Sequence, residues 1–198
     1  EANIYCQKRN KEIFYNIGLV GIVPKLKGFM KGLELLKILK KEDGKFKLYI
    51  MGKLPEEIEW IKNNPEENEY FKRCDDFIKD NDLEDSVIYG GFVERENLYN
   101  DMGYVLSLSD NEKPESFHLA PAEGVCSGSI GMLLNWPGVE YIYSKDFIFE
   151  NIEEMSKFIL NVSNNESLFN EILKKQKDYI ISNYNIDSFM EKLLVYLK

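Results

Sequence analysis

The sequence predicts an α/β protein with a Rossmann-like, doubly wound parallel sheet between two layers of helices. Apolar strand-like runs alternate with amphipathic helix-like runs along the chain, with short connections. Such alternation requires right-handed crossovers, which make the strands parallel. The strand-like runs are almost continuously apolar, as is typical of strands covered by helices on both faces. The 198 residues are therefore expected to form a single three-layer α/β/α domain over 1–198.

The first half of the chain alternates clearly between the two kinds of run. Strands are expected at 13–23 and 45–53, and helices at 28–42, 55–64 and 69–82. The first run, IFYNIGLVGIV, is β-branched and apolar. The helix at 28–42 has leucines on one face and lysines on the other. Pro55 followed by two glutamates suits a helix N-terminus.

The second half continues the pattern and ends in helices. Strands are expected at 86–92, 104–110, 129–135 and 146–150, and helices at 95–102, from Phe117 or His118 onward, 152–163, 166–184 and 186–198. Ser116 is a suitable N-cap for the helix after residue 115. The last helix, 186–198, is apolar on one side, which suits packing on its own domain. Residues 1–12 form a leading segment.

The overall composition excludes several classes of function. The formal net charge of −9 disfavours long-range attraction to nucleic acid. No apolar run approaches the ~18 residues of a membrane-spanning helix. Cys6, Cys74 and Cys126 lie far apart and form no CxxC motif, so neither a disulfide framework nor a zinc site is expected. We expect a reducing cytosol, no metal and no cofactor.

Lysines crowd the loop after the first strand. In such sheets ligands bind beyond the carboxyl ends of the strands, where loops lead into helices. Lys25, Lys27 and Lys31 surround Gly28 at the start of a helix, and a helix N-terminus attracts phosphate. The segment predicts a diphosphate site, and solvent-exposed lysines on an amphipathic helix are the alternative. The loop is neither a GxGxxG fingerprint nor a P-loop.

The stretch PESFHLAPAEG follows the fourth expected strand and carries two carboxylates. A pure helix would separate Glu115 from Glu123 by ~12 Å, which exceeds the roughly 5–9.5 Å between glycosidase carboxylates. Two such carboxylates suit hydroxyl groups on two parts of an extended ligand, such as a sugar and a ribose. The backbone amides of Phe117, His118 and Leu119 would face phosphate oxygens. A capping or packing role for the histidine, and chance spacing of the glutamates, are the alternatives.

Together these segments resemble the C-terminal half of family 4 glycosyltransferases, which are retaining enzymes of the GT-B fold. The resemblance runs from about Phe14 to Tyr184. The matching positions are Gly21, Lys27–Gly28, Val87, Tyr89, Gly91, Val93, Glu115, Phe117, Glu123 and Ser127–Gly128. Their order along the chain, each at the expected strand end, is more specific than any one of the motifs.

The resemblance implies a role for each matching position. Lys27 would bind the donor diphosphate and Glu115 the transferred sugar, and these two would be the catalytic residues. Glu123 would hold the ribose, residues 116–119 would cradle the distal phosphate, and Val93 would lie beside the base. Transfer in this family is metal-independent, and the lysine and backbone amides would stabilise the leaving diphosphate electrostatically.

Three positions depart from the family's pattern and indicate a divergent subgroup. Ile22 stands where the family has Arg after the glycine of the first strand, so Gly21 is followed by no cation unless Lys25 replaces it. His118 stands where the family has Gly, so its side chain would touch phosphate or sugar directly. Ile130 replaces a usual proline.

The resemblance also implies a whole protein about twice this size. The last helix, 186–198, would then pack toward the missing half, and packing on its own domain is an equal alternative. The chain would be the donor half, inactive alone, of a bacterial enzyme that transfers sugar from a nucleotide-diphosphate sugar. The acceptor, a glycan or lipid-linked glycan, would bind a missing N-terminal domain, in polysaccharide or glycoconjugate synthesis. A cytoplasmic location is expected, with peripheral attachment at the inner membrane face an alternative for the whole protein.

Two other functions stay open on the sequence. A nucleotide-sugar epimerase on the same scaffold would need further acid–base residues, of which a single histidine leaves few. A non-catalytic nucleotide-binding or interaction module is the other. Nucleotide base, sugar, acceptor, linkage and oligomeric state are not determined by these motifs.

Overall fold

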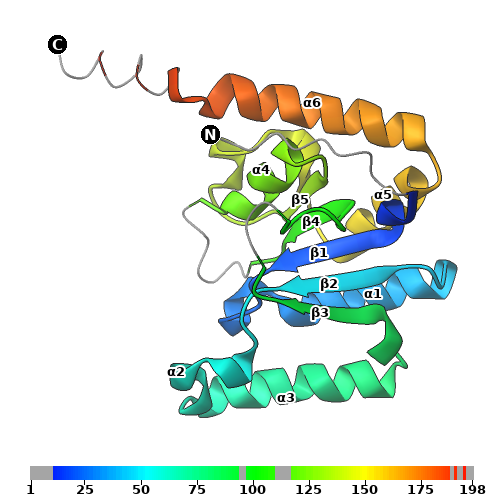
Figure 1. Cartoon of the computed structure of the whole chain (residues 1–198), viewed down its shortest axis with the longest axis vertical. Coiled ribbons are helices and arrows are strands. Elements are labelled where there is room, and N and C mark those ends of the chain that lie inside the picture. Colours follow the sequence, from blue (N-terminus) through cyan, green and yellow to red (C-terminus); the bar gives the residue numbers. More distant parts are fainter. Residues whose placement is uncertain (1–10, 94–96, 110–116, 188–189, 191–193, 195–198) are drawn as a thin grey trace.

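The protein folds around a six-stranded parallel sheet. The computed structural model describes residues 11–93, 97–109, 117–187, 190 and 194. The strands are β1 (Asn16–Val20), β2 (Lys47–Met51), β3 (Val87–Gly91), β4 (Tyr104–Ser107), β5 (Ile130–Leu134) and β6 (Ile148–Phe149). Their order is β3-β2-β1-β4-β5-β6, and every neighbouring pair is parallel (Figure 1). The predicted Rossmann-like class is confirmed, and the strand order reverses between β1 and β4.

Helices cover both faces of this sheet. They are α1 (Phe29–Glu42), α2 (Glu59–Lys62), α3 (Pro65–Asp80), α4 (Leu119–Cys126), α5 (Ile152–Ser163) and α6 (Glu166–Tyr184). Helix α1 contacts α3 and α5, whereas α4 packs on β4 and β5 from the other side and contacts α6. Figure 1 shows α6 running along the β5 side of the sheet. These contacts form the expected three layers.

The central strands are buried on both faces. In β4, Tyr104 and Leu106 belong to the large core that includes α1 and α5. Val105, between them, belongs to a second cluster with Ala120 of α4. Neighbouring residues of a strand point to opposite faces, so Ser107 lies on the same face as Val105. Burial on both sides explains why the strand-like runs lack polar alternation.

A glutamine from α6 completes the backbone pairing of β5. The buried Gln176 side chain accepts from Gly131 N and donates to Gly131 O, both at 2.9 Å. The same Nε2 donates to the carbonyl of Asp146 at 3.1 Å. Strand β6 pairs only with Leu133 and Leu134. The carboxamide therefore occupies the ladder groups of β5 that β6 does not reach.

Two predicted elements in the first half of the chain begin with a 3-10 turn. The run at 13–23 starts with a 3-10 turn, Lys11–Tyr15, and extends as β1 only from Asn16. Ile13 is nevertheless buried, and a short apolar run does not by itself distinguish strand from turn. The helix expected at 55–64 is split, because Ile58 is extended between a 3-10 turn, Pro55–Glu57, and α2.

Helix α3 begins four residues earlier than predicted. Asn64 is its N-cap and accepts hydrogen bonds from the amides of Glu66 and Glu67, with Pro65 in the first position. Asparagine before proline is a recognised helix start, so the signal was present in a stretch that we assigned to a polar connection.

The helix predicted at 95–102 is wrong for the part that the structure describes, because residues 97–101 form a turn. The Asn100 side chain donates to the side chain of Asn97, and asparagine favours such local bonding over helix. In the helix expected at 186–198, residues 186, 187, 190 and 194 are helical, and the others lie outside the described residues.

Candidate functional site

Three neighbouring strands end in glycines with a positive φ. Gly21 after β1, Gly52 after β2 and Gly91 at the end of β3 have φ values of 76°, 111° and 66°. Gly21 N donates to Met51 O at 2.7 Å, and Gly52 N donates to Gly91 O at 2.8 Å. Glycine adopts a positive φ readily, whereas residues with a side chain do so only with strain. The backbone therefore turns sharply along the edge where ligands bind in this class of sheet.

Gly28 brings the start of α1 against the chain that leaves β4. Its φ is +77°, and a Cβ there would lie 2.1 Å from the carbonyl oxygen of Leu108. No other residue fits without moving backbone. The Lys27–Gly28 pair therefore lies at the reversal of strand order between β1 and β4. One amide of this helix start is already used, since Met30 N donates to the Tyr70 hydroxyl at 2.8 Å.

The two predicted lysines differ in their surroundings. The Lys25 ammonium lies 2.8 Å from the Glu66 carboxylate, and this hydrogen bond lowers the pKa of Glu66. The Lys25 amide donates to the buried carboxylate of Glu67. Both the ammonium group and the backbone amide of Lys25 are therefore bound to carboxylates of α3. Ile22, at the family's arginine position, is buried in the core, so Lys27 is the better candidate for a diphosphate cation.

His118 ties the start of α4 to the end of β4. Its Nδ1 and Ser107 Oγ lie 2.6 Å apart and share a hydrogen bond. Its carbonyl accepts from the Tyr143 hydroxyl at 2.6 Å, and burial raises the pKa of Tyr143. These bonds hold His118 extended as the N-cap of α4. The prediction that Ser116 caps this helix is therefore wrong.

The residues beside His118 have contrasting environments. The Phe117 ring stacks on Tyr143 with centroids 6.0 Å apart and meets the Tyr184 ring edge-on at 5.3 Å. Leu119, the first residue of α4, is 56% exposed. Since α4 starts here, the amides of Leu119 and Ala120 lack intrahelical acceptors. The helix start predicted at Phe117 or His118 is therefore wrong by one or two residues. Of the three amides that were expected to face phosphate, only that of Leu119 belongs to the helix.

Glu123 receives a hydrogen bond that the sequence reasoning missed. The Tyr99 hydroxyl donates to Glu123 Oε2 at 2.7 Å. Tyr99 is 3% exposed and belongs to a cluster with Met102 and Val105, against which Val93 also packs. Tyr99 and Glu123 come from separate elements, so neither periodicity nor spacing could have paired them.

The end of α4 explains the Ser127–Gly128 match. Gly128 has a φ of 96° and Ser127 N donates to Glu123 O, which are features of a helix C-terminus closed by glycine. Gly124, inside the helix, has room for no side chain, because a Cβ would lie 2.5 Å from Val105. The helix therefore packs closely on β4, and this fixes the height of Glu123 above the sheet edge.

Two predicted site residues, Glu115 and Ser116, lie outside the described residues. The separation of ~12 Å between Glu115 and Glu123 assumed an unbroken helix. Helix α4 begins only at Leu119, so that spacing argument does not apply to this fold.

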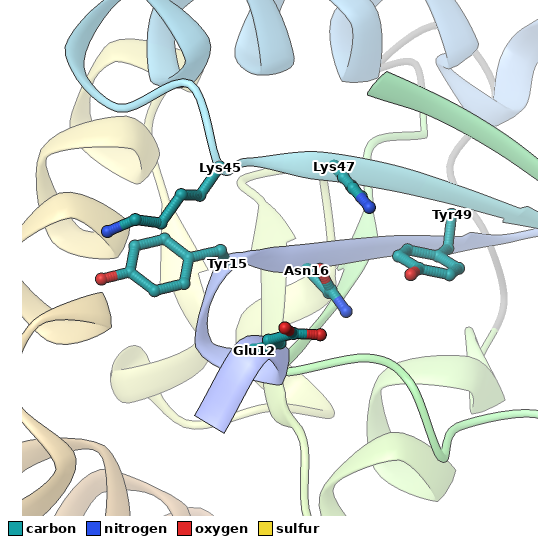
Figure 2. Close-up of a pocket in the computed structure, with 6 residues that line it drawn as sticks. All are labelled: Glu12, Tyr15, Asn16, Lys45, Lys47 and Tyr49. Atoms are coloured by element: carbon teal, nitrogen blue, oxygen red, sulfur yellow. The ribbon is translucent and has the colours of Figure 1, made fainter. Parts of the chain in front are cut away.

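A pocket lies at the opposite, amino-end edge of the sheet. It has a volume of about 450 Å³ and is lined by Glu12, Tyr15, Asn16, Lys45, Lys47 and Tyr49. Figure 2 shows these side chains around the first residues of β1 and β2. The Lys45 ammonium lies over the Tyr15 ring, 4.7 Å from its centroid. None of the predicted site residues that the structure describes lines this pocket, which we call the amino-edge pocket.

The described residues show neither a metal site nor a membrane-spanning helix. Within them, no group of three or more His, Cys, Asp or Glu side chains is arranged to hold a metal ion. None of the helices in that part of the chain combines the length and apolar character needed to cross a membrane.

Comparison with known proteins gives structural matches only. The sequence matches no protein-family model and no curated protein. Among solved structures, S. aureus TarM superposes with a TM-score of 0.75 at 21% identity, over 96% of this chain and 36% of TarM. Anabaena HepE, in complex with UDP and glucose, gives a TM-score of 0.75 at 15% identity, over 92% of this chain and 48% of HepE.

A third match is itself a single domain. The C-terminal domain of the group 1 glycosyl transferase LpcC from Francisella tularensis superposes with a TM-score of 0.70 at 16% identity. The match covers 94% of this chain and 98% of that domain. By contrast, the chain spans about a third of TarM and half of HepE. The chain therefore has the Rossmann-like fold of one half of a GT-B glycosyltransferase.

Proposed function

We propose that this chain is the donor domain of a glycosyltransferase and binds a nucleotide-diphosphate sugar. The fold supports this proposal, because it matches parts of two proteins, TarM and HepE, that were crystallised with UDP. The structural observation that carries it is the meeting of two segments at one edge of the sheet. Lys27–Gly28 lies against Leu108 after β4, and Glu123 stands on the helix that follows the same strand.

The proposal gives several of the predicted residues a role in the donor site. Lys27 and the amides at the start of α4 hold the diphosphate, which a helix N-terminus attracts. Glu123 accepts hydrogen bonds from the ribose hydroxyls. Val93 packs against the cluster that contains Tyr99, the hydrogen-bond partner of Glu123, and in this proposal it lies beside the base. Glu115 keeps its proposed role with the transferred sugar.

The proposed reaction moves a glycosyl group to an acceptor with retention of configuration and without a metal. The bond from the anomeric carbon to the diphosphate oxygen breaks, and a bond from that carbon to an acceptor hydroxyl oxygen forms on the same face. Negative charge develops on the leaving diphosphate, which takes up the proton of the acceptor hydroxyl. Lys27 and the helix amides stabilise that charge. The acceptor, a glycan or lipid-linked glycan, binds a further domain, so the chain alone binds the donor and transfers nothing.

Calorimetric titration with nucleoside diphosphates tests donor binding directly. A panel of UDP, GDP and ADP with their sugar conjugates is measured in EDTA. Hydrogen bonds to charged groups contribute about 1.5–3 kcal/mol, so Lys27→Ala and Glu123→Ala are each expected to weaken binding about tenfold or more. Lys41→Ala, at the other end of α1, and Glu171→Gln, on an exposed turn of α6, serve as matched controls.

The outcomes separate the parts of the proposal. Failure of every nucleotide to bind would favour a non-catalytic interaction module. Binding that is lost in EDTA and restored by Mg²⁺ would contradict metal independence. Equal affinity in both variants and both controls would show that the donor site lies elsewhere. Conversion of the donor sugar to its epimer by the whole protein would favour the epimerase.

A further inference from the structure

We infer that Tyr99 is a positioning residue for the nucleotide ribose and acts by holding the Glu123 carboxylate in its binding orientation. This inference rests on the proposed donor function. It starts from a contact between a buried tyrosine of the loop before β4 and a carboxylate on α4, 24 positions further along the chain.

The contact fixes one oxygen of Glu123. Tyr99 donates to Oε2 at 2.7 Å. A carboxylate accepts about four hydrogen bonds through its two oxygens, so this bond uses only part of the accepting capacity of the side chain. A hydrogen bond of this length restricts the rotation of the carboxylate, and it therefore sets the direction in which the other acceptor positions point.

Tyr99 is itself held rigidly, which makes its hydroxyl a fixed donor. The ring is buried in the cluster with Met51, Met102, Val105 and Ala120. Its carbonyl accepts from Met102 N, and the Asn16 side chain of β1 donates to Asp101 O in the same loop. The loop that carries Tyr99 is thus anchored to the central strand, and α4 packs on the neighbouring strand β4.

Holding Glu123 in advance lowers the cost of binding. A glutamate side chain loses up to about 1.5–2 kcal/mol of rotamer entropy when it is immobilised. If Tyr99 immobilises the Glu123 side chain during folding, ribose binding does not have to supply this entropy cost. A purely structural tyrosine would instead affect stability, with the same effect on every ligand.

Ligands with and without ribose hydroxyls distinguish the two roles. Titrations compare UDP with 2′,3′-dideoxy-UDP, or the matching GDP or ADP pair if the panel selects another base. Tyr99→Phe keeps the ring and removes only the hydroxyl. We expect it to weaken UDP binding five- to twentyfold and to leave the affinity for the dideoxy nucleotide unchanged within twofold.

A second variant keeps the inference testable if Tyr99→Phe does not fold. Glu123→Ala removes the acceptor and leaves Tyr99 in place, and we expect it to lose the preference for UDP over the dideoxy nucleotide. In the Glu123→Ala background, adding Tyr99→Phe should cause no further loss of affinity for UDP.

Three results would overturn the inference. They are unchanged UDP affinity in Tyr99→Phe, an equal loss for UDP and its dideoxy analogue, and a wild-type protein that binds the two ligands equally. If the wild-type protein binds no nucleoside diphosphate at all, the proposed function fails as well. The two failures are therefore distinguishable.

Discussion

The two ends of the sheet use their polar groups differently. At the carboxyl end, the backbone turns through positive-φ glycines, and Glu123 accepts from the neutral hydroxyl of Tyr99. At the amino end, the amino-edge pocket has one lysine that is engaged locally. Lys45 lies 3.4 Å from Asp43, which raises the pKa of Lys45, and it also covers the Tyr15 ring. The two edges therefore differ both in backbone geometry and in the partners of their charged side chains.

Topology explains the difference between the two ends. In a parallel sheet with right-handed crossovers, the helices that follow the strands begin at the carboxyl edge. Their N-termini direct amides and partial positive charge toward that edge, where phosphate is stabilised. The amino edge receives helix C-termini, so an anionic ligand there would depend on lysine side chains alone. Three predictions test this contrast.

The largest effect is expected from Gly28→Ala. The alanine Cβ would meet the carbonyl of Leu108 at 2.1 Å with a φ of +77°, so we expect a loss of about 3 kcal/mol or more in the free energy of unfolding. Gly21→Ala has the positive φ without the contact and should cost about 1–2 kcal/mol. Urea denaturation measures both.

Gly44→Ala is the matched control for this series. Its Cβ would have nothing within 4 Å, so its stability should change by less than about 0.5 kcal/mol. Equal stability of the Gly28 and Gly44 variants would show that α1 and the chain after β4 are not in tight contact.

An intermediate effect is expected from Tyr143→Phe. The ring and its packing stay, but the carbonyl of His118 loses its buried donor. The loss of one hydrogen bond costs about 0.5–1.5 kcal/mol, and the start of α4 should become less well ordered. We expect a lower free energy of unfolding and a few-fold loss of nucleotide affinity. Tyr141→Phe, on an 86% exposed side chain, is the control. A stability loss without any loss of affinity would separate α4 from the donor site.

The smallest effect is expected from Lys45→Ala in the amino-edge pocket. Its ion pair is exposed, and such pairs contribute little to stability. We expect nucleotide affinity within twofold of the wild type, measured in the same titration as Lys27→Ala. A tenfold loss for Lys45→Ala, together with no loss for Lys27→Ala, would reverse the comparison and place the anion site at the amino end.

The fold was predictable because each element carries its own pattern. The ranges 152–163 and 166–184 match α5 and α6 at both ends, since each helix has a capping asparagine and a periodic apolar face. The start of α3 was missed although Asn64 and Pro65 signalled it. The turn at 97–101 was missed because local asparagine bonding outweighed a weak helical pattern.

The site was only partly predictable, because its geometry depends on contacts between distant residues. Gly28 was assigned correctly to the start of a helix, but its contact with Leu108 depends on the packing of β1 beside β4. His118 was expected to face a ligand, whereas one ring nitrogen bonds to Ser107. Tyr99 had no local signal at all. Periodicity describes single elements, and these residues are defined by pairs of elements.

The Gln176 side chain protects part of the edge of β5, which affects the solubility of any form of the chain that ends before α6. Its carboxamide closes the ladder groups of Gly131 that β6 leaves open. An open strand edge is a template for pairing with another molecule. Because this cover comes from α6, any form of the chain that ends before α6 would expose part of β5 as an unpaired edge. Loss of the last helices would then lead to aggregation between molecules, rather than only to a less stable monomer.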